Sequence, residues 1–142
     1  MISPHQRYGD FLQSLHAENM GGLKDMVTTD VRFKDPFNDV RGVTAMLAIF
    51  DHMFRTVGPV VFTVNRSFGD AETGMLSWRF TGRLRGQDWC FDGTSVLAFD
   101  QTGKVREHID HWDAAHDFYA HVPVIGWQLA WVRRLIANHS NG

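Results

Sequence analysis

The sequence has almost no cysteine. Cys90 is the only one among 142 residues, so no disulfide can form within the chain and no cysteine cluster can bind zinc. Blocks of one charge are also missing: charged residues make up 21% of the chain and the formal net charge is −2. Arg133-Arg134 is the only dense basic spot, which argues against a nucleic-acid-binding surface.

Long apolar runs are absent as well. No stretch approaches the roughly 20 apolar residues that a membrane-spanning helix needs. The first residues, MISPHQRYGDF, lack the basic start and apolar run of a signal peptide. We therefore expect a cytoplasmic protein without an integral membrane segment, of a length that fits one domain.

Helical periodicity and strand alternation follow one another along the chain. The spacing of apolar residues predicts helices over residues 5–18, 23–28 and 43–56, and a last helical stretch from about 113 to 137 with a break at Pro123. Alternation predicts a strand over residues 31–35, ended by Pro36, and four long strands over 59–68, 73–84, 87–99 and 104–112. Helices followed by a long strand meander indicate an α+β fold with helices on one face of a curved sheet.

Three short motifs stand out: Gln6-Arg7-Tyr8 in the first helix, Asp35-Pro36-Phe37 after the first strand, and Gly103-Lys104-Val105 at the start of the last strand. Together they resemble ketosteroid isomerase. The element order is similar to the cone fold shared by nuclear transport factor 2, ketosteroid isomerase, scytalone dehydratase and the SnoaL-like polyketide cyclases. The resemblance implies one SnoaL-like domain over residues 1–142, with a cone-shaped curved antiparallel sheet and a C-terminal helical extension over 114–138. The N-terminal helices would pack on the concave face of the sheet.

The same resemblance implies roles for individual residues. Tyr8 would donate a hydrogen bond to a developing oxyanion, and Asp35 would move the proton. Ser95 falls where the family has a second oxyanion donor, a protonated aspartate, and is a weaker donor. The resemblance also implies a homodimer that uses no cofactor.

Strand parity independently selects two acidic positions. Asp35 shares a face with the apolar Val31 and Phe33, so its carboxyl should be buried with a raised pKa that suits a general acid or base. Alternatively, Asp35 accepts backbone N–H groups of the following loop. In the last strand, His108 and Asp110 share a face, and a histidine beside a carboxylate is a good proton shuttle.

The alternative for this pair is a buried polar network that fixes the packing of helices on the sheet. Arg106 and Trp112 share the face of His108 and Asp110, whereas Glu107 and His111 face away. Asp113 is expected to cap the helix that follows it. His108 and His111 face opposite ways and cannot chelate one ion, so we expect no metal site.

Aromatic residues make up 13% of the chain. The family register turns those of the second and third long strands inward, where they line either a pocket for a planar apolar ligand or a plain core. The candidate substrate-binding residues are Phe33, Phe37, Trp78, Phe80, Trp89, Phe91, Ser95 and Trp112, and the candidate catalytic residues are Asp35, Tyr8, His108 and Asp110.

Three functions compete. The leading one is a cofactor-independent isomerase, cyclase or dehydratase that acts on a small, apolar carbonyl compound by general acid–base catalysis. The second is a non-catalytic ligand-binding or interaction module, with a pocket filled by side chains and a partner on the open sheet face. The third is an epoxide hydrolase of the limonene type, built from Asp35, Arg106 and Asp110. Trp127, Trp131 and Leu135 in the tail, at i, i+4 and i+8, would cap the cone, contact a second subunit or rest on a membrane surface.

Overall fold

The computed structural model describes residues 2–121 and 123–137. The chain divides into two compact units between Trp112 and Asp113. The helices of the first unit are α1 (Pro4–Ser14), the short 3-10 turn η1 (Met20–Gly22), α2 (Leu23–Met26) and α3 (Val43–Thr56). Its strands are β1 (Val27–Lys34), β2 (Asp39–Arg41), β3 (Val61–Gly69), β4 (Thr73–Leu84), β5 (Gln87–Phe99) and β6 (Val105–His111).

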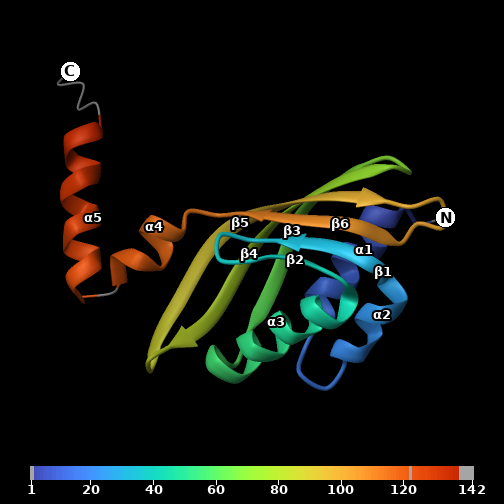
Figure 1. Ribbon diagram of the computed structural model, residues 1–142, viewed down its shortest axis with the longest axis horizontal. Coiled ribbons are helices and arrows are strands. Elements are labelled where there is room, and N and C mark those ends of the chain that lie inside the picture. Colours follow the sequence, from blue (N-terminus) through green and yellow to red (C-terminus); the bar gives the residue numbers. More distant parts are fainter. Residues whose placement is uncertain (1, 122, 138–142) are drawn as a thin grey trace. The chain divides into compact units, whose positions relative to one another are not determined.

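The six strands form one curved, unclosed sheet in the order β2-β1-β6-β5-β4-β3, with the helices of the first unit along it (Figure 1). This is the α+β architecture that the sequence predicts. The sheet is mixed rather than purely antiparallel, because β1 and β6 pair in parallel. The short strand β2, which pairs antiparallel with β1, was not predicted.

Helix α1 is shorter than its apolar periodicity predicts. It begins with Pro4 in the first turn, a position that needs no backbone N–H, after Ser3 as the capping residue. It ends at Ser14 instead of residue 18. Hydrogen bonds of the Asn19 side chain hold the residues after Ser14 in a non-helical conformation. The Asn19 amide donates to the Ser14 carbonyl at 2.9 Å and accepts the His16 N–H at 2.7 Å.

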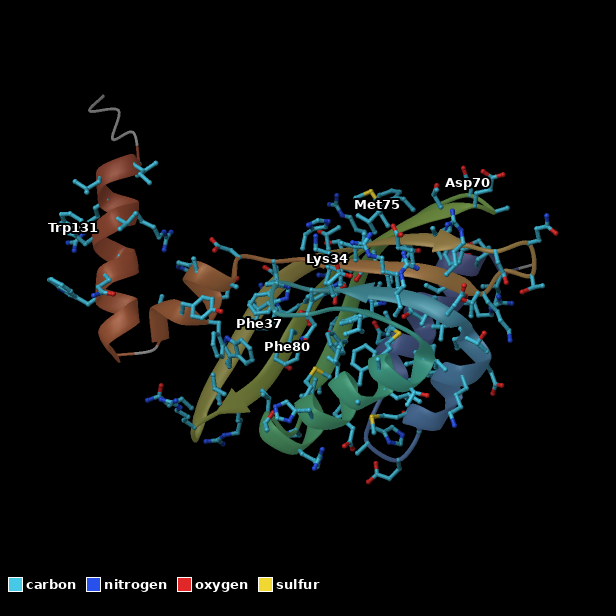
Figure 2. All side chains as sticks on the ribbon, in the orientation of Figure 1. Lys34, Phe37, Asp70, Met75, Phe80 and Trp131 are labelled. Carbon is cyan, nitrogen blue, oxygen red and sulfur yellow. The ribbon has the colours of Figure 1, made fainter. Side chains whose placement is uncertain are left out.

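The sheet of the first unit has an inner and an outer face. The inner face carries the core, and Figure 2 shows Phe80 on the side of α3 and Met75 on the opposite side. On the outer face Phe68 lies opposite Met75, and Met75 lies opposite Val96 in the next strand. All three side chains are exposed, so an apolar row crosses three neighbouring strands.

The second unit contains α4 (Ala114–Asp117), a 3-10 turn η2 (Tyr119–His121) and α5 (Pro123–Ile136). The expected helix cap is confirmed, since Asp113 Oδ1 accepts the His116 N–H at 3.0 Å. Trp127, Trp131 and Leu135 form an exposed row on α5. None of the helices in the described part of the chain has the length and apolarity to span a membrane.

Candidate functional site

His108 lies at the centre of the polar residues inside the first unit. Its side chain on β6 is only 2% exposed. Phe33 is its partner across the parallel β1–β6 pairing, and the two rings meet edge to face with centroids 5.0 Å apart. Tyr8 from α1 forms a second edge-to-face contact at 5.5 Å. The imidazole is therefore held between two aromatic rings that restrict its orientation.

A chain of hydrogen bonds runs through this histidine. The Tyr8 hydroxyl lies 2.7 Å from His108 Nδ1, and His108 Nε2 lies 2.7 Å from Asp110 Oδ1. Ser95, directly opposite Asp110 on β5, donates from Oγ to the same Oδ1 at 2.5 Å. Trp78 Nε1 donates to Ser95 Oγ at 2.9 Å. Five side chains from α1, β4, β5 and β6 thus share one network.

One distribution of protons satisfies the whole network. An indole N–H can only donate, so Ser95 Oγ accepts from Trp78 and turns its own proton toward Asp110. With Asp110 as a carboxylate, His108 donates from Nε2, and its Nδ1 accepts from Tyr8. With the proton on Nδ1 instead, His108 would donate to the Tyr8 oxygen, and the Tyr8 O–H would have no acceptor. The Tyr8 side chain is only 1% exposed, so this loss costs about 1–3 kcal/mol.

Burial also affects the ionisation of Tyr8. Removal of its phenol from water raises the pKa of Tyr8 well above 10.0, and the nearby charge of Asp110 adds to this increase. Tyr8 therefore stays protonated over the physiological range and remains a hydrogen-bond donor. Its proton points to His108, so the structure gives it a different partner from the oxyanion that the resemblance implies.

Gly93 makes the contact between Trp78 and Ser95 possible. Gly93 is the partner of Trp78 across the β4–β5 pairing. A Cβ atom at this position would lie 2.3 Å from Cη2 of the indole, so any residue other than glycine would displace the ring from this position. From there its Nε1 reaches Ser95, two residues further along the strand.

A small cavity opens onto the end of this network. Its volume is about 10 Å³, which is close to the space that one water molecule needs. The polar side of the lining consists of Ser95, His108 and Asp110, and the apolar side consists of Leu12, Phe50, Phe62, Val64 and Trp78. A ring-sized ligand can enter only if some of these side chains move.

Asp35 lies just beyond the end of β1 and is half-buried. Its Oδ1 accepts the backbone N–H of Phe37 at 2.8 Å and that of Asn38 at 2.7 Å. Burial raises the pKa of Asp35 above its ordinary value of 3.8, these hydrogen bonds oppose the shift, and the charge of Asp110 adds a smaller increase. Asp35 thus fixes the loop after β1 through these hydrogen bonds, and its carboxyl is close enough to Asp110 for the two charges to interact.

The other expected aromatic residues form a cluster beside the cavity. Phe80 and Phe91 stack with centroids 4.7 Å apart, and Phe91 stacks on Trp112 at 4.3 Å. Trp89 joins the same cluster, and Phe37 meets Trp112 edge to face at 5.4 Å. Phe80, Trp89 and Phe91 are buried, whereas Phe37 is 45% exposed. Of the eight expected substrate-binding residues, the cavity lining contains Trp78 and Ser95.

Several lining residues were not selected from the sequence. Leu12, Phe50, Phe62 and Val64 look like ordinary core positions of a helix or strand, and no local signal distinguishes them. Gly93 carries a weak signal, because a glycine inside a strand often marks a close approach of another group.

The structure corrects the expected position of Arg106. A bulge near the start of β6 breaks the alternation, so Val105 is buried and Arg106 is exposed. Its Nε donates to the carbonyl of Phe99 at 3.4 Å. Arg106 is therefore not part of the cavity lining, and the Asp–Arg–Asp set of an epoxide hydrolase is not assembled around it. In the described residues, no group of three or more histidine, cysteine or acidic side chains is arranged to hold a metal ion.

The comparisons with known proteins agree with this fold. The model of the SnoaL-like domain family matches residues 8–108. The chain belongs to the SnoaL-like domain family. This match runs from Tyr8 to His108, so both ends of the central hydrogen bond lie within the family domain. No curated protein matches the sequence.

Solved structures show the same fold at low identity. An NTF2-like protein of unknown function from Burkholderia pseudomallei K96243 is 16% identical, with a TM-score of 0.70 over 97% of this chain and 100% of that one. An epoxide hydrolase of the LEH-like type from M. tuberculosis is also 16% identical, with a TM-score of 0.69 over 94% and 95%. A protein with a ketosteroid isomerase-like fold from Catenulispora acidiphila DSM 44928, solved in complex with trimethylamine, is 11% identical, with a TM-score of 0.66 over 77% and 86%.

Proposed function

We propose that this SnoaL-like protein is a cofactor-independent enzyme that moves a proton on a small, largely apolar carbonyl compound, as an isomerase, cyclase or dehydratase. The observation that carries the proposal is the buried network of Tyr8, His108 and Asp110, which ends on a cavity with apolar walls. A carboxylate and an imidazole in hydrogen-bond contact form a proton-accepting pair that works in a dry site.

The four expected catalytic residues then have different tasks. Asp110 accepts or returns the proton at Oδ2, because Oδ1 already accepts from His108 and Ser95. His108 stabilises the carboxylate through Nε2. Tyr8 is a positioning residue, which fixes the tautomer of His108 through Nδ1. Asp35 is a second proton carrier at the same end of the sheet, and its raised pKa favours proton uptake.

The test is hydrogen–deuterium exchange next to the carbonyl of candidate ligands. Planar enones and small steroid ketones are incubated with the protein in D2O, and deuterium uptake is followed by mass spectrometry. Wild type should accelerate exchange, and Asp110→Asn should slow the catalysed rate by roughly 10²-fold or more. Asp88→Asn is the matched control, because the Asp88 side chain is 93% exposed. Full exchange activity in Asp110→Asn would refute the proposed role of Asp110.

The non-catalytic binding or interaction module remains the second candidate, and the small size of the cavity favours it. This reading predicts that ligands raise the melting temperature by mass action without any deuterium uptake. The same incubation therefore separates the two functions: binding with exchange supports the enzyme, and binding without exchange supports the module.

We also propose that the protein forms a homodimer through the outer face of the sheet. The apolar row of Phe68, Met75 and Val96 is exposed on three neighbouring strands. A contiguous exposed apolar patch of this kind is typical of an interaction surface. A second copy of the chain offers the same row, so a two-fold axis would place each row against its counterpart.

A further inference from the structure

We infer that the ligand group in contact with Asp110 is a hydrogen-bond donor, a hydroxyl or a protonated amine, rather than a bare carbonyl oxygen. The inference rests on the proposed function for the location of the site. It narrows the ligand from apolar carbonyl compounds in general to compounds that also carry such a donor. Oδ2 has two lone-pair sites, so it can accept this hydrogen bond and still take up the proton that the proposed function requires.

The side-chain donors in the described lining of the cavity are directed to other groups of the protein. Trp78 Nε1–H is directed to Ser95, and the Ser95 hydroxyl is directed to Asp110. His108 Nε2–H is directed to Asp110 as well. Leu12, Phe50, Phe62 and Val64, the remaining lining residues, have no polar hydrogen on their side chains. Among the described lining residues, every side-chain N–H and O–H is therefore already used inside the protein.

The side-chain acceptors of the cavity lining include one oxygen that remains available to a ligand. Ser95 Oγ and Asp110 Oδ1 are occupied by the same hydrogen bonds. Asp110 Oδ2 accepts no hydrogen bond from any side chain or backbone group that the structure describes. The Asp110 side chain is 15% exposed, and the residue lines the cavity. The site thus offers a ligand one charged acceptor and no side-chain donor.

The charge of the site also favours a hydrogen-bond donor. Arginine and lysine are absent from the described lining of the cavity. The charge of Asp110 also raises the pKa of Asp35, so a second carboxyl group is within electrostatic reach. A carbonyl oxygen placed against Asp110 Oδ2 would bring two acceptors together, whereas a hydroxyl or an ammonium group would complete the hydrogen bonding of Oδ2.

The aromatic lining residues would bind a protonated amine more strongly than a neutral alcohol. Phe50, Phe62 and Trp78 belong to the lining of the same cavity, and aromatic rings attract a cation through their faces. A protonated amine would gain this attraction in addition to the hydrogen bond, and a neutral alcohol would gain the hydrogen bond alone. Both belong to the same donor class, and a matched set of ligands separates them.

The experiment compares 2-tetralol, 2-aminotetralin and 2-tetralone, which share one bicyclic apolar body. Dissociation constants are measured by NMR titration of the wild-type protein, with the Trp78 indole resonance as the local probe. We expect the alcohol or the amine to bind at least roughly tenfold more tightly than the ketone, as one hydrogen bond to a charged acceptor supports. Equal or tighter binding of the ketone would overturn the inference.

The variant Asp110→Asn provides the complementary measurement, because its amide can donate to a carbonyl oxygen. The preference for the alcohol or amine should disappear or reverse in this variant, and the control Asp88→Asn should keep it. A preference that persists unchanged in Asp110→Asn would show that another group selects the donor, and would also overturn the inference. The wild-type comparison does not depend on the folding of any variant. Deuterium exchange tests the proposed catalysis separately, so the failure of one idea does not imply the failure of the other.

Discussion

The Tyr8 hydroxyl lies 2.7 Å from Nδ1 of His108, although the two residues are 100 positions apart in the sequence. One comes from the first helix and the other from the last strand of the sheet. Tyr8 is the buried end of the hydrogen-bond network. Asp110 is the other end, and it lines the cavity.

Tyr8→Phe tests the buried end. The substitution keeps the ring and removes the donor, so the buried Nδ1 of His108 loses its partner. We expect the free energy of unfolding to fall by about 1–3 kcal/mol, measured by urea denaturation. A stability equal to that of the wild type in Tyr8→Phe would contradict the described network.

Gly93→Ala tests the position of Trp78. The added methyl group would meet the indole at 2.3 Å, so the ring must move away from Ser95. We expect a loss of about 1–3 kcal/mol in unfolding free energy and a shift of the Trp78 indole proton resonance. Gly21→Ala is the matched control, because no atom lies within 4 Å of a Cβ at that position. An unshifted indole resonance in Gly93→Ala would rule out the close contact.

Asp35→Asn tests the electrostatics of the loop after β1. Because burial raises the pKa of Asp35, the stability that this carboxyl contributes is fully present below its ordinary value of 3.8 and is lost as pH rises through the raised value. The asparagine does not titrate. The variant should therefore gain stability relative to wild type as pH rises from 4 to 7, measured by urea denaturation.

Asp39→Asn is the control for this pH dependence, with the opposite expected sign. A hydrogen bond from Arg32 lowers the pKa of Asp39, so its contribution is present above the ordinary value and is lost as pH falls through the lowered value. The same pH slope in both variants would contradict the assigned environment of Asp35.

Met75→Lys tests the proposed dimer. A charge in the middle of the row formed by Phe68, Met75 and Val96 should weaken self-association at least tenfold, measured by sedimentation over a range of protein concentrations. Thr81→Lys places the same charge on an exposed position of the same strand and face, outside the row. If both variants sediment like wild type, the outer-face dimer is wrong.

Local patterns in the sequence predict most of the elements. The bounds expected for α3, β4 and β5 agree with the structure, because each has an uninterrupted period and clear turn residues at its ends. The three-residue strand β2 is too short for alternation to reveal it. The parallel pairing of β1 with β6 joins segments more than 70 residues apart, and local periodicity holds no information about such pairs.

The sequence predicts less of the site than of the fold. Parity alone brings His108 and Asp110 to one face, but it fails for Arg106 because the β6 bulge inserts a residue there. The partnership of Tyr8 with His108 depends on how α1 packs on the sheet, so the sequence selected both residues without predicting their contact. The position of the Trp78 indole depends on Gly93, which only the structure reveals.

The most direct test of the central claim is the protonation of the His108 ring. Long-range ¹H–¹⁵N NMR on histidine-labelled protein at neutral pH distinguishes the two neutral tautomers. The described network predicts a proton on Nε2, directed to Asp110, and an Nδ1 that accepts from Tyr8. A His108 protonated on Nδ1 alone would reverse the direction of every hydrogen bond along the histidine, and would contradict Asp110 as the charged acceptor of the site.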